Sequence, residues 1–470
     1  MLFSSVPFLY YFLPIVILIY FAVPFKFKNL VLLAASLFFY FYGEPIYVVL
    51  MVVSSLSAYI HGLLIDKFKG TKWSKVFMVS SVVVGLSALL FFKYTDFFIS
   101  IVNGVSGADI GLLKIALPIG ISFYTFQTIS YTIDVYRGDA KVQKNFIHLA
   151  TYVALFPQLI AGPIVRYTTV EEDLNTRKHS LAQFSDGAFR FVIGLAKKVL
   201  IADSLGTLCN PGQIFRLSDE KSVVFYWVYA ITYCLQIYYD FSGYSDMAIG
   251  LGKIFGFRFL ENFNYPFISK SVSEFWRRWH MSLGSWFRDY VYIPLGGNRV
   301  SKLKWFGNVL VVWFLTGFWH GADWTFIIWG LYFALFLLLE KLFLSKWLEK
   351  VPSFVAHIYV FFVMIVSFVI FNGNGVAGSV SDLGGMIGAL DIPFVNDTTL
   401  YYLKSYAPLI IVAAIGSTPI VKNIAIKLRN SEKLGKVANI LEPMVMVALL
   451  VVVTAYLVDS SASFFLYFRF

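Results

Sequence analysis

The stretch SEFWRRWHMSLGSWFRDY, residues 273–290, gathers three tryptophans, three arginines and a histidine in a chain that is otherwise strongly apolar. Of the 470 residues, 59% are hydrophobic and only 14% are charged, and the mean hydropathy is +0.73. A soluble fold of this length cannot bury so much apolar surface. Apolar runs of about 17 to 25 residues, long enough to cross a bilayer, recur along the whole chain. The sequence therefore predicts a polytopic integral membrane protein.

These apolar runs are continuous, and they lack the alternation of polar and apolar residues that marks the strands of a membrane barrel. We therefore expect an all-α fold, built as one membrane-embedded domain over residues 1–470. N-terminal spans should occupy residues 1–145, a more polar central region residues 146–345, and C-terminal spans residues 346–470. No basic residue precedes Lys26, so the first apolar run predicts a retained span rather than a cleaved signal peptide.

The net charge of +11 is concentrated in connecting loops, which favours a role in membrane orientation over nucleic-acid binding. Four lysines lie within residues 67–75 and five basic residues within 421–436, whereas residues 372–403 contain none. Because basic loops are retained in the cytoplasm, this pattern predicts an N-terminus outside the cell. The two cysteines, Cys209 and Cys234, have no metal-binding spacing and are expected to be packing residues.

In the middle of the chain, the apolar runs are interrupted by prolines, glycine and charged residues. FPQLIAGPIVR (156–166) has two prolines and a glycine in an apolar run, which predicts a broken or re-entrant helix. FRFVIGLAKKVLIAD (189–203) places four charged residues on one helix, and a span from about Val223 to Tyr239 is followed by Asp240 and Asp246. Carboxylates at membrane depth indicate either a functional site or pairing and capping roles. Both interpretations stay open.

Within the opening stretch, Ser271 and Glu274 form a capping box, so a helix should start near Val272. Trp276 and His280 should share one face of it, and a second short helix should follow Gly284, with a turn at PLGGNR (294–299). Neither helix is long enough to span, so both should lie in the membrane interface. Arginine and tryptophan there suit two roles. They can anchor the helices on anionic lipid, or they can form the entrance of a binding site for an anionic cofactor.

A second polar feature, GFWHGADWTFIIWG (317–330), places His320 between apolar helices at about 306–319 and 324–341. Gly317 and Gly321 are expected to leave room beside its ring. An imidazole in an apolar pocket stays neutral and can accept a proton, as a general base does. A histidine here can also simply donate a hydrogen bond between helices.

Together, FWRRWHMSLGSWFRDYVYIPLGGNR (275–299), GFWHGADWTFIIWG, YYDFSGYSDMAIG (238–250) and FPQLIAGPIVR resemble the membrane-bound O-acyltransferase (MBOAT) superfamily. They are most similar to its bacterial alginate and peptidoglycan O-acetyltransferase branch. The resemblance implies a bundle of about eleven or more spans, with re-entrant or interfacial helices, around a transmembrane tunnel. It also implies a multi-pass protein of the bacterial cytoplasmic membrane, with residues 146–345 as the catalytic centre. His320 is then the catalytic residue and His280 a second characteristic histidine.

The function implied is transfer of an acetyl group from a cytoplasmic thioester, acetyl-CoA, to a hydroxyl of an exported polysaccharide or an extracytoplasmic partner protein. No tightly bound cofactor or metal is expected, and membrane lipid is a further partner. The residues expected to hold the donor are the aromatic and basic ones of the opening stretch, Trp276, Arg277, Arg278, Trp279 and Arg288. The alternatives are D-alanyl transfer to teichoic acid, which the PLGGNR turn disfavours, and a transporter of glycans or lipid-linked sugars.

Overall fold

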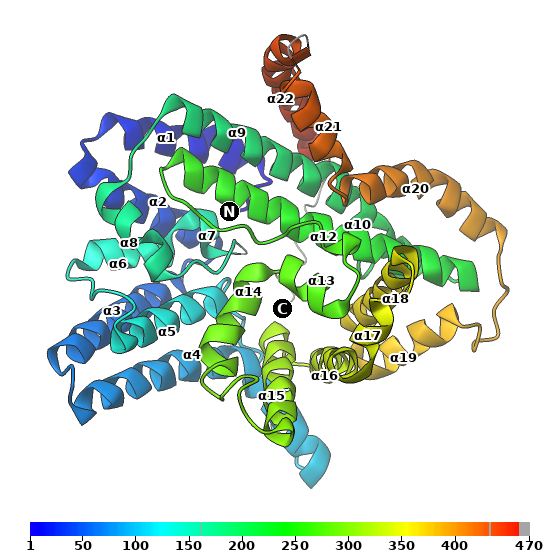
Figure 1. The fold of residues 1–470 in the computed structure, drawn as a ribbon, viewed down its shortest axis with the longest axis horizontal. Coiled ribbons are helices and arrows are strands. Elements are labelled where there is room, and N and C mark those ends of the chain that lie inside the picture. Colours follow the sequence, from blue (N-terminus) through cyan, green and yellow to red (C-terminus); the bar gives the residue numbers. More distant parts are fainter. Residues whose placement is uncertain (161, 432–433, 460–470) are drawn as a thin grey trace. The chain divides into compact units, whose positions relative to one another are not determined.

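The computed structural model describes residues 1–160, 162–431 and 434–459, and the regular structure in these ranges is entirely helical (Figure 1). This confirms the all-α fold. Three parts of the predictions lie outside the described residues: position 161 of the broken helix, positions 432–433 of the basic loop, and positions 460–470 of the C-terminal spans.

In the described ranges, seven helices are long and apolar enough to cross a membrane. They are α2 (Phe25–Gly43), α3 (Val48–Lys67), α4 (Lys72–Ser106), α16 with its continuation (Trp324–Leu348), α18 (Ser353–Asn372), α20 (Asp397–Gly416) and α22 (Leu434–Asp459). A shorter apolar helical segment, Phe8–Ala22, contains α1 (Leu13–Ala22). The polytopic architecture is confirmed, and the number of eleven spans stays a prediction.

The described residues form two compact units. The first comprises Met1–Phe191 and Ser245–Leu260, where α3 packs against α4 and α5 (Ile121–Arg137), and α2 packs against α6 (Phe146–Ala154). The second comprises Val192–Tyr244 and the described chain from Glu261 onward. The remaining helices named below are α8 (Tyr167–Thr176), α9 (Leu181–Ala196), α11 (Ile214–Leu217), α12 (Val223–Ile254), α13 (Val272–Arg278), α14 (Met281–Phe287) and α15 (Lys302–His320).

The predicted helix break in the first unit is confirmed. Helix α6 ends at Ala154, a single turn α7 (Phe156–Leu159) follows, and the described residues between α7 and α8, 160 and 162–166, have no regular structure. Protein groups satisfy the freed polar atoms: the Phe156 N–H donates to Ser36 Oγ (3.0 Å), and the Tyr152 hydroxyl donates to the carbonyl of Val165 (3.0 Å). Irregular backbone at membrane depth requires such internal partners.

The charges of the central helices are paired. Helix α9 continues through the π-helical segment Lys197–Asp203, so the four charges do lie on one helical stretch. In the first unit Arg190 binds Asp246 (2.8 Å). In the second, Lys198 is 1% exposed and binds both Asp203 (2.6 Å) and Asp240 (2.7 Å). The geometry thus favours the pairing role for the carboxylates of Asp240 and Asp246.

Helix α12 extends to Ile254, well beyond the predicted end at Tyr239, so Asp240 and Asp246 lie inside a helix. The ion pairs offset the cost of burying the carboxylates, and small residues permit the packing that forms the pairs. A Cβ on Gly243 would lie 2.7 Å from the carbonyl oxygen of Gly194. Close approach of α12 to α9 therefore depends on glycine at this position.

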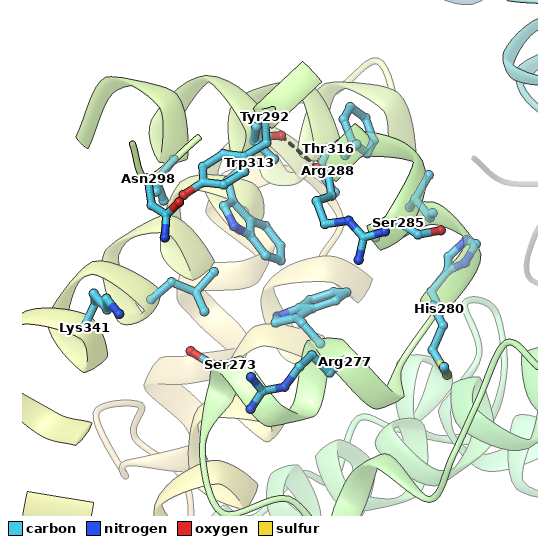
Figure 2. Close-up of a pocket in the computed structure, with 18 of the residues that line it drawn as sticks. Ser273, Arg277, His280, Ser285, Arg288, Tyr292, Asn298, Trp313, Thr316 and Lys341 are labelled. Carbon is cyan, nitrogen blue, oxygen red and sulfur yellow. Dashed lines mark hydrogen bonds between the residues drawn. The ribbon is translucent and has the colours of Figure 1, made fainter. Parts of the chain in front are cut away.

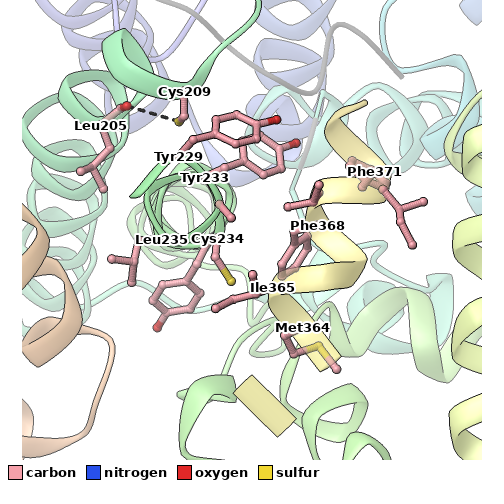
Figure 3. Packing of buried hydrophobic residues seen from close by; sticks show 14 of the residues in the cluster. Leu205, Cys209, Tyr229, Tyr233, Cys234, Leu235, Met364, Ile365, Phe368 and Phe371 are labelled. Carbon is pink, nitrogen blue, oxygen red and sulfur yellow. Dashed lines mark hydrogen bonds between the residues drawn. The ribbon is translucent and has the colours of Figure 1, made fainter. Parts of the chain in front are cut away.

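The core of the second unit lies between α12 and α18, where Tyr229, Tyr233, Phe368 and Phe371 pack together (Figure 3). Cys209 and Cys234 are both free thiols and fully buried in the same cluster. Their prediction as packing residues is confirmed.

Candidate active site

Helix α13 begins where the sequence predicts, at Val272, with the Ser271 hydroxyl accepting a hydrogen bond from the Glu274 N–H (3.0 Å). The sequence did not reveal the second anchor of this helix start, Glu340. Its carboxylate accepts from the N–H groups of Val272 (2.5 Å) and Ser273 (2.9 Å) and from the Ser273 hydroxyl (2.7 Å). A buried carboxylate at a helix N-terminus also complements the helix dipole. Glu340 therefore fixes α13 against the end of α16.

Replacing Glu340 with Ala is expected to destabilise the protein by about 2 kcal/mol or more, because these three donors and the Tyr359 hydroxyl lose a charged acceptor. The thermal unfolding midpoint of the detergent-purified protein measures this. Glu349→Ala, on an exposed residue nearby, is the control and should leave the midpoint nearly unchanged. Equal midpoints for the two variants would show that Glu340 does not anchor α13.

The prediction that Trp276 and His280 share one helix is wrong. Helix α13 ends at Arg278 and α14 begins at Met281, because His280 has a left-handed backbone with φ of +45°. Asn262 imposes this break: its carbonyl accepts from the Met281 N–H (3.0 Å) and its side-chain oxygen from the Ser282 N–H (3.1 Å). Helix α14 thus starts before Gly284 rather than after it. The turn at PLGGNR is confirmed.

The ring of His280 is buried, with 2% of the residue exposed. Nδ1 lies 3.3 Å from Asn262 Oδ1, and Nε2 has no hydrogen-bond partner among the described residues. Phe241 packs edge-on against the ring at 4.6 Å between centroids. Burial lowers the pKa of His280 to about 3, so the imidazole is neutral at physiological pH. It can orient a ligand by hydrogen bonding but supplies no positive charge.

His280 should make the fold sensitive to acid. Its ordinary pKa is 6.5, so as the pH falls from 6.5 towards 3 the unfolded chain binds a proton that the native state excludes, and stability is lost. In the variant His280→Asn, the asparagine can adopt the left-handed backbone, and its side chain does not titrate. The unfolding midpoint of the wild type should therefore fall relative to this variant between pH 7.5 and 4.5. A pH-independent difference between the two midpoints would contradict the prediction.

A cavity of about 550 Å³ in the second unit brings together four of the predicted site residues, Trp276, Arg277, His280 and Arg288. Helices α13, α14 and α15 form its walls, and Figure 2 shows Arg277 below and Arg288 above it in that view. Both arginines are exposed, and Lys341 also lines the cavity. Arg288 binds the neighbouring Asp289 (2.6 Å), whereas Arg277 forms no close ion pair among the described residues. The cavity is therefore basic at its rim.

The walls of this cavity are aromatic. The Trp276 ring contacts Trp313 (4.7 Å between centroids) and Phe333 (4.8 Å), and Trp313 and Trp305 also line the space. Flat rings beside exposed guanidinium groups suit a ligand that carries both phosphates and an aromatic base.

Arg278 and Trp279 do not line the cavity. Arg278 binds Glu274 (2.9 Å) and the carbonyl of Asn264 (3.1 Å) on a different side of α13. Trp279 is 5% exposed and packs against Phe275 (5.4 Å between centroids) in the core. Their roles in donor binding stay predictions, and the geometry favours Arg277 and Arg288 for them.

His320 is the last residue of α15 and is 8% exposed. It does not line the cavity, but Thr316, one helical turn earlier, does. The ring of Trp319 lies 4.9 Å from the His320 ring and 6.1 Å from the His280 ring, between centroids. The two histidines therefore flank one tryptophan, and the cavity ends one turn short of His320.

The glycines beside His320 do not leave open room. A Cβ on Gly317 would lie 2.2 Å from the carbonyl oxygen of Phe326, and one on Gly321 would lie 2.2 Å from the Phe326 ring. These residues are glycine because α15 and α16 approach closely there. The prediction of free space beside the ring is wrong, since Phe326 fills it.

Trp329 is a neighbour of His320 that the sequence did not single out. It is 2% exposed, its ring lies edge-on to the imidazole at 5.0 Å between centroids, and its Nε1 has no partner among the described residues. Buried N–H groups are rarely left unsatisfied, so an unused donor beside a candidate base is a functional signal. Only the fold shows it, because the two residues lie on different helices.

Comparisons with known proteins identify the family. Residues 138–381 match the model of MBOAT, the membrane-bound O-acyltransferase family. A probable alginate O-acetylase of Azotobacter vinelandii is 42% identical over 379 residues, covering 80% of this chain and 75% of the relative. The peptidoglycan O-acetyltransferase of Helicobacter pylori is 34% identical over 442 residues, covering 87% and 82%. The teichoic acid D-alanyltransferase of Bacillus subtilis is 31% identical over 278 residues, covering 54% and 69%. The chain therefore belongs to the membrane-bound O-acyltransferase family and is an acyltransferase.

Proposed function

We propose that this protein transfers an acetyl group from acetyl-CoA on the cytoplasmic side of the bacterial inner membrane to a hydroxyl on the other side. The acceptor is an exported polysaccharide or an extracytoplasmic partner protein. The observation that carries the proposal is the basic, aromatic cavity that reaches to one helical turn from His320. Similarity to alginate and peptidoglycan O-acetyltransferases supports acetyl as the group and a glycan as the acceptor.

In this proposal the phosphates of acetyl-CoA bind at the cavity rim. Arg277 is available because it is exposed and forms no close ion pair among the described residues, and Arg288 and Lys341 add positive charge. Guanidinium groups suit phosphates because they donate two hydrogen bonds in a fixed plane. The rings of Trp276 and Trp313 then pack against the uncharged parts of the donor.

One helical turn beyond the cavity lining at Thr316, His320 acts as general base. It removes the proton of the acceptor hydroxyl, the oxygen attacks the thioester carbonyl, the carbon–sulfur bond breaks, and the proton passes to the departing thiolate. The buried N–H of Trp329 suits the negative charge that develops on the carbonyl oxygen. The neutral ring of His280, which lines the cavity, orients the donor.

The orientation of the loops supports a cytoplasmic donor and an external acceptor. The basic loops are assigned to the cytoplasm, with the N-terminus outside. The segment 372–403, which has no Lys or Arg, then faces outwards and is available to an extracytoplasmic partner. Its helix α19 (Gly375–Met386) is held by Asp382, which binds Arg216 of α11 (2.7 Å).

Reconstitution into proteoliposomes tests the proposal. Radiolabelled acetyl-CoA is supplied to the protein with an alginate or peptidoglycan fragment, and acetylated product and free CoA are measured together. Equal amounts of both, dependent on His320, support acetyl transfer. Movement of intact sugar without thioester consumption would instead establish a transporter, and activity only with a D-alanyl thioester would establish alanyl transfer.

A further inference from the structure

A second cavity, of about 450 Å³, lies in the first unit and has no part in the proposed reaction. Its walls are mostly apolar, with Ile17 and Phe21 from α1, Phe184 from α9 and Ile254 from α12. Its polar lining consists of His179, Ser180, Gln183 and Lys253. Phe21 is 41% exposed and Leu181, at the rim, is 89% exposed. The apolar lining is therefore continuous with surface that contacts lipid in a membrane protein.

The chain beside this cavity contains a buried arginine. Arg177 is 5% exposed, its Nε donates to the Tyr20 hydroxyl (2.8 Å), and its Nη1 donates to Asn29 Oδ1 (2.7 Å). Its Nη2 has no partner among the described residues, and no carboxylate of these residues forms an ion pair with it. The carboxylate of Asp173, one turn earlier, binds Arg258 instead (2.8 Å). A buried charge normally has a counter-charge, so Arg177 marks a local excess of positive charge.

Two lysines add to this excess. Lys253 lines the cavity, and the Nζ of Lys28 lies 5.0 Å from the centroid of Phe21, a wall residue. Neither lysine has an acidic partner in the part of the chain that the structure describes. Burial and the positive charges of Lys28 and Arg177 hold the pKa of His179 below its usual range. The surroundings of the cavity therefore favour an anion.

We propose that this cavity binds an anionic phospholipid, with its phosphate near Lys253, His179 and Ser180 and an acyl chain against Ile17, Phe21 and Phe184. Lys28 and Arg177 stabilise the phosphate through their charge. The apolar walls open to the lipid-facing surface, where an acyl chain can cover them. A free phosphate or CoA has no such chain, so the walls favour a lipid phosphate. The proposal is independent of the acetyltransferase function.

The test compares lipids on the purified full-length protein in detergent. Phosphatidylglycerol should raise the unfolding midpoint more than the same amount of phosphatidylcholine, and native mass spectrometry should show preferential retention of phosphatidylglycerol. If inorganic phosphate or free CoA produced the same stabilisation, the site would belong to a soluble phosphate. If both lipids stabilised equally, the positive charges would have no ligand role, and the proposal would fail.

The variant Lys28→Gln/Lys253→Gln removes the two most accessible charges and should weaken phosphatidylglycerol binding about tenfold. Lys26→Gln is the control, because Lys26 lies on α2, as Lys28 does, and is exposed. The midpoint of each variant in phosphatidylcholine shows whether it is folded. If the double variant proves unfolded, Lys253→Gln alone is tested and should weaken binding about fivefold. Full retention of phosphatidylglycerol by either folded variant would overturn the proposal.

Discussion

His320→Ala is expected to lower acetyl transfer by a factor of about 10² to 10⁴, the range that loss of a general base produces. The affinity for acetyl-CoA should change little, because the basic rim of the cavity is formed by other residues. The ring packs edge-on against Trp329 and Phe371, so its removal leaves a small hole rather than an unpaired charge. We therefore expect the variant to insert into membranes and to remain folded.

The control for this variant is His357→Ala. His357 lies in the same unit, on α18, and its Nδ1 is 3.1 Å from the carbonyl of Ser269. This substitution also deletes an imidazole, but it should retain most of the acetyl transfer. Added imidazole should partly restore the reaction of His320→Gly, a readout that a purely structural role would not move. Normal product formation by His320→Ala would exclude this residue as the base.

Much of the fold follows from local patterns. Hydropathy predicts the spans, because a bilayer requires long apolar helices whatever their neighbours are. The start of α13 follows from Ser271 and Glu274, which are three residues apart, and the break after α6 follows from proline and glycine in the run. Each of these features depends on residues within one or two helical turns.

The features that the sequence did not reveal depend on distant partners. Asn262 sets the left-handed backbone of His280 from 18 residues away, and Glu340 anchors α13 from 67 residues away. The burial of Asp240 inside α12 is offset by Lys198, which lies 42 residues earlier in the chain. Spacing within one segment cannot show which side of α13 faces a cavity, so Trp276 and Trp279 looked equivalent as donor-binding residues although only Trp276 lines the cavity.

Arg277→Ala should raise the KM for acetyl-CoA about tenfold and leave kcat nearly unchanged. A charge-assisted hydrogen bond to a phosphate contributes about 1.5 kcal/mol at an exposed site, which corresponds to this factor. Arg277→Ala/Arg288→Ala should raise the KM further, because both guanidinium groups lie at the cavity rim. Acetyl-pantetheine, which has no nucleotide phosphates, is the diagnostic donor. With it, the variants and the wild type should have similar KM values.

Arg278→Ala is the matched control, since it removes the same side chain from the next position of the same helix. Its partner is Glu274, and both side chains are 27% exposed, so losing the pair should cost less than about 1 kcal/mol of stability. Its KM for acetyl-CoA should rise less than about threefold, because an exposed charge outside the cavity acts on the donor only through screened electrostatics. A larger rise for Arg278→Ala than for Arg277→Ala would place the donor on the other side of α13. A loss of membrane yield in both variants, with unchanged KM, would instead make these arginines a lipid anchor.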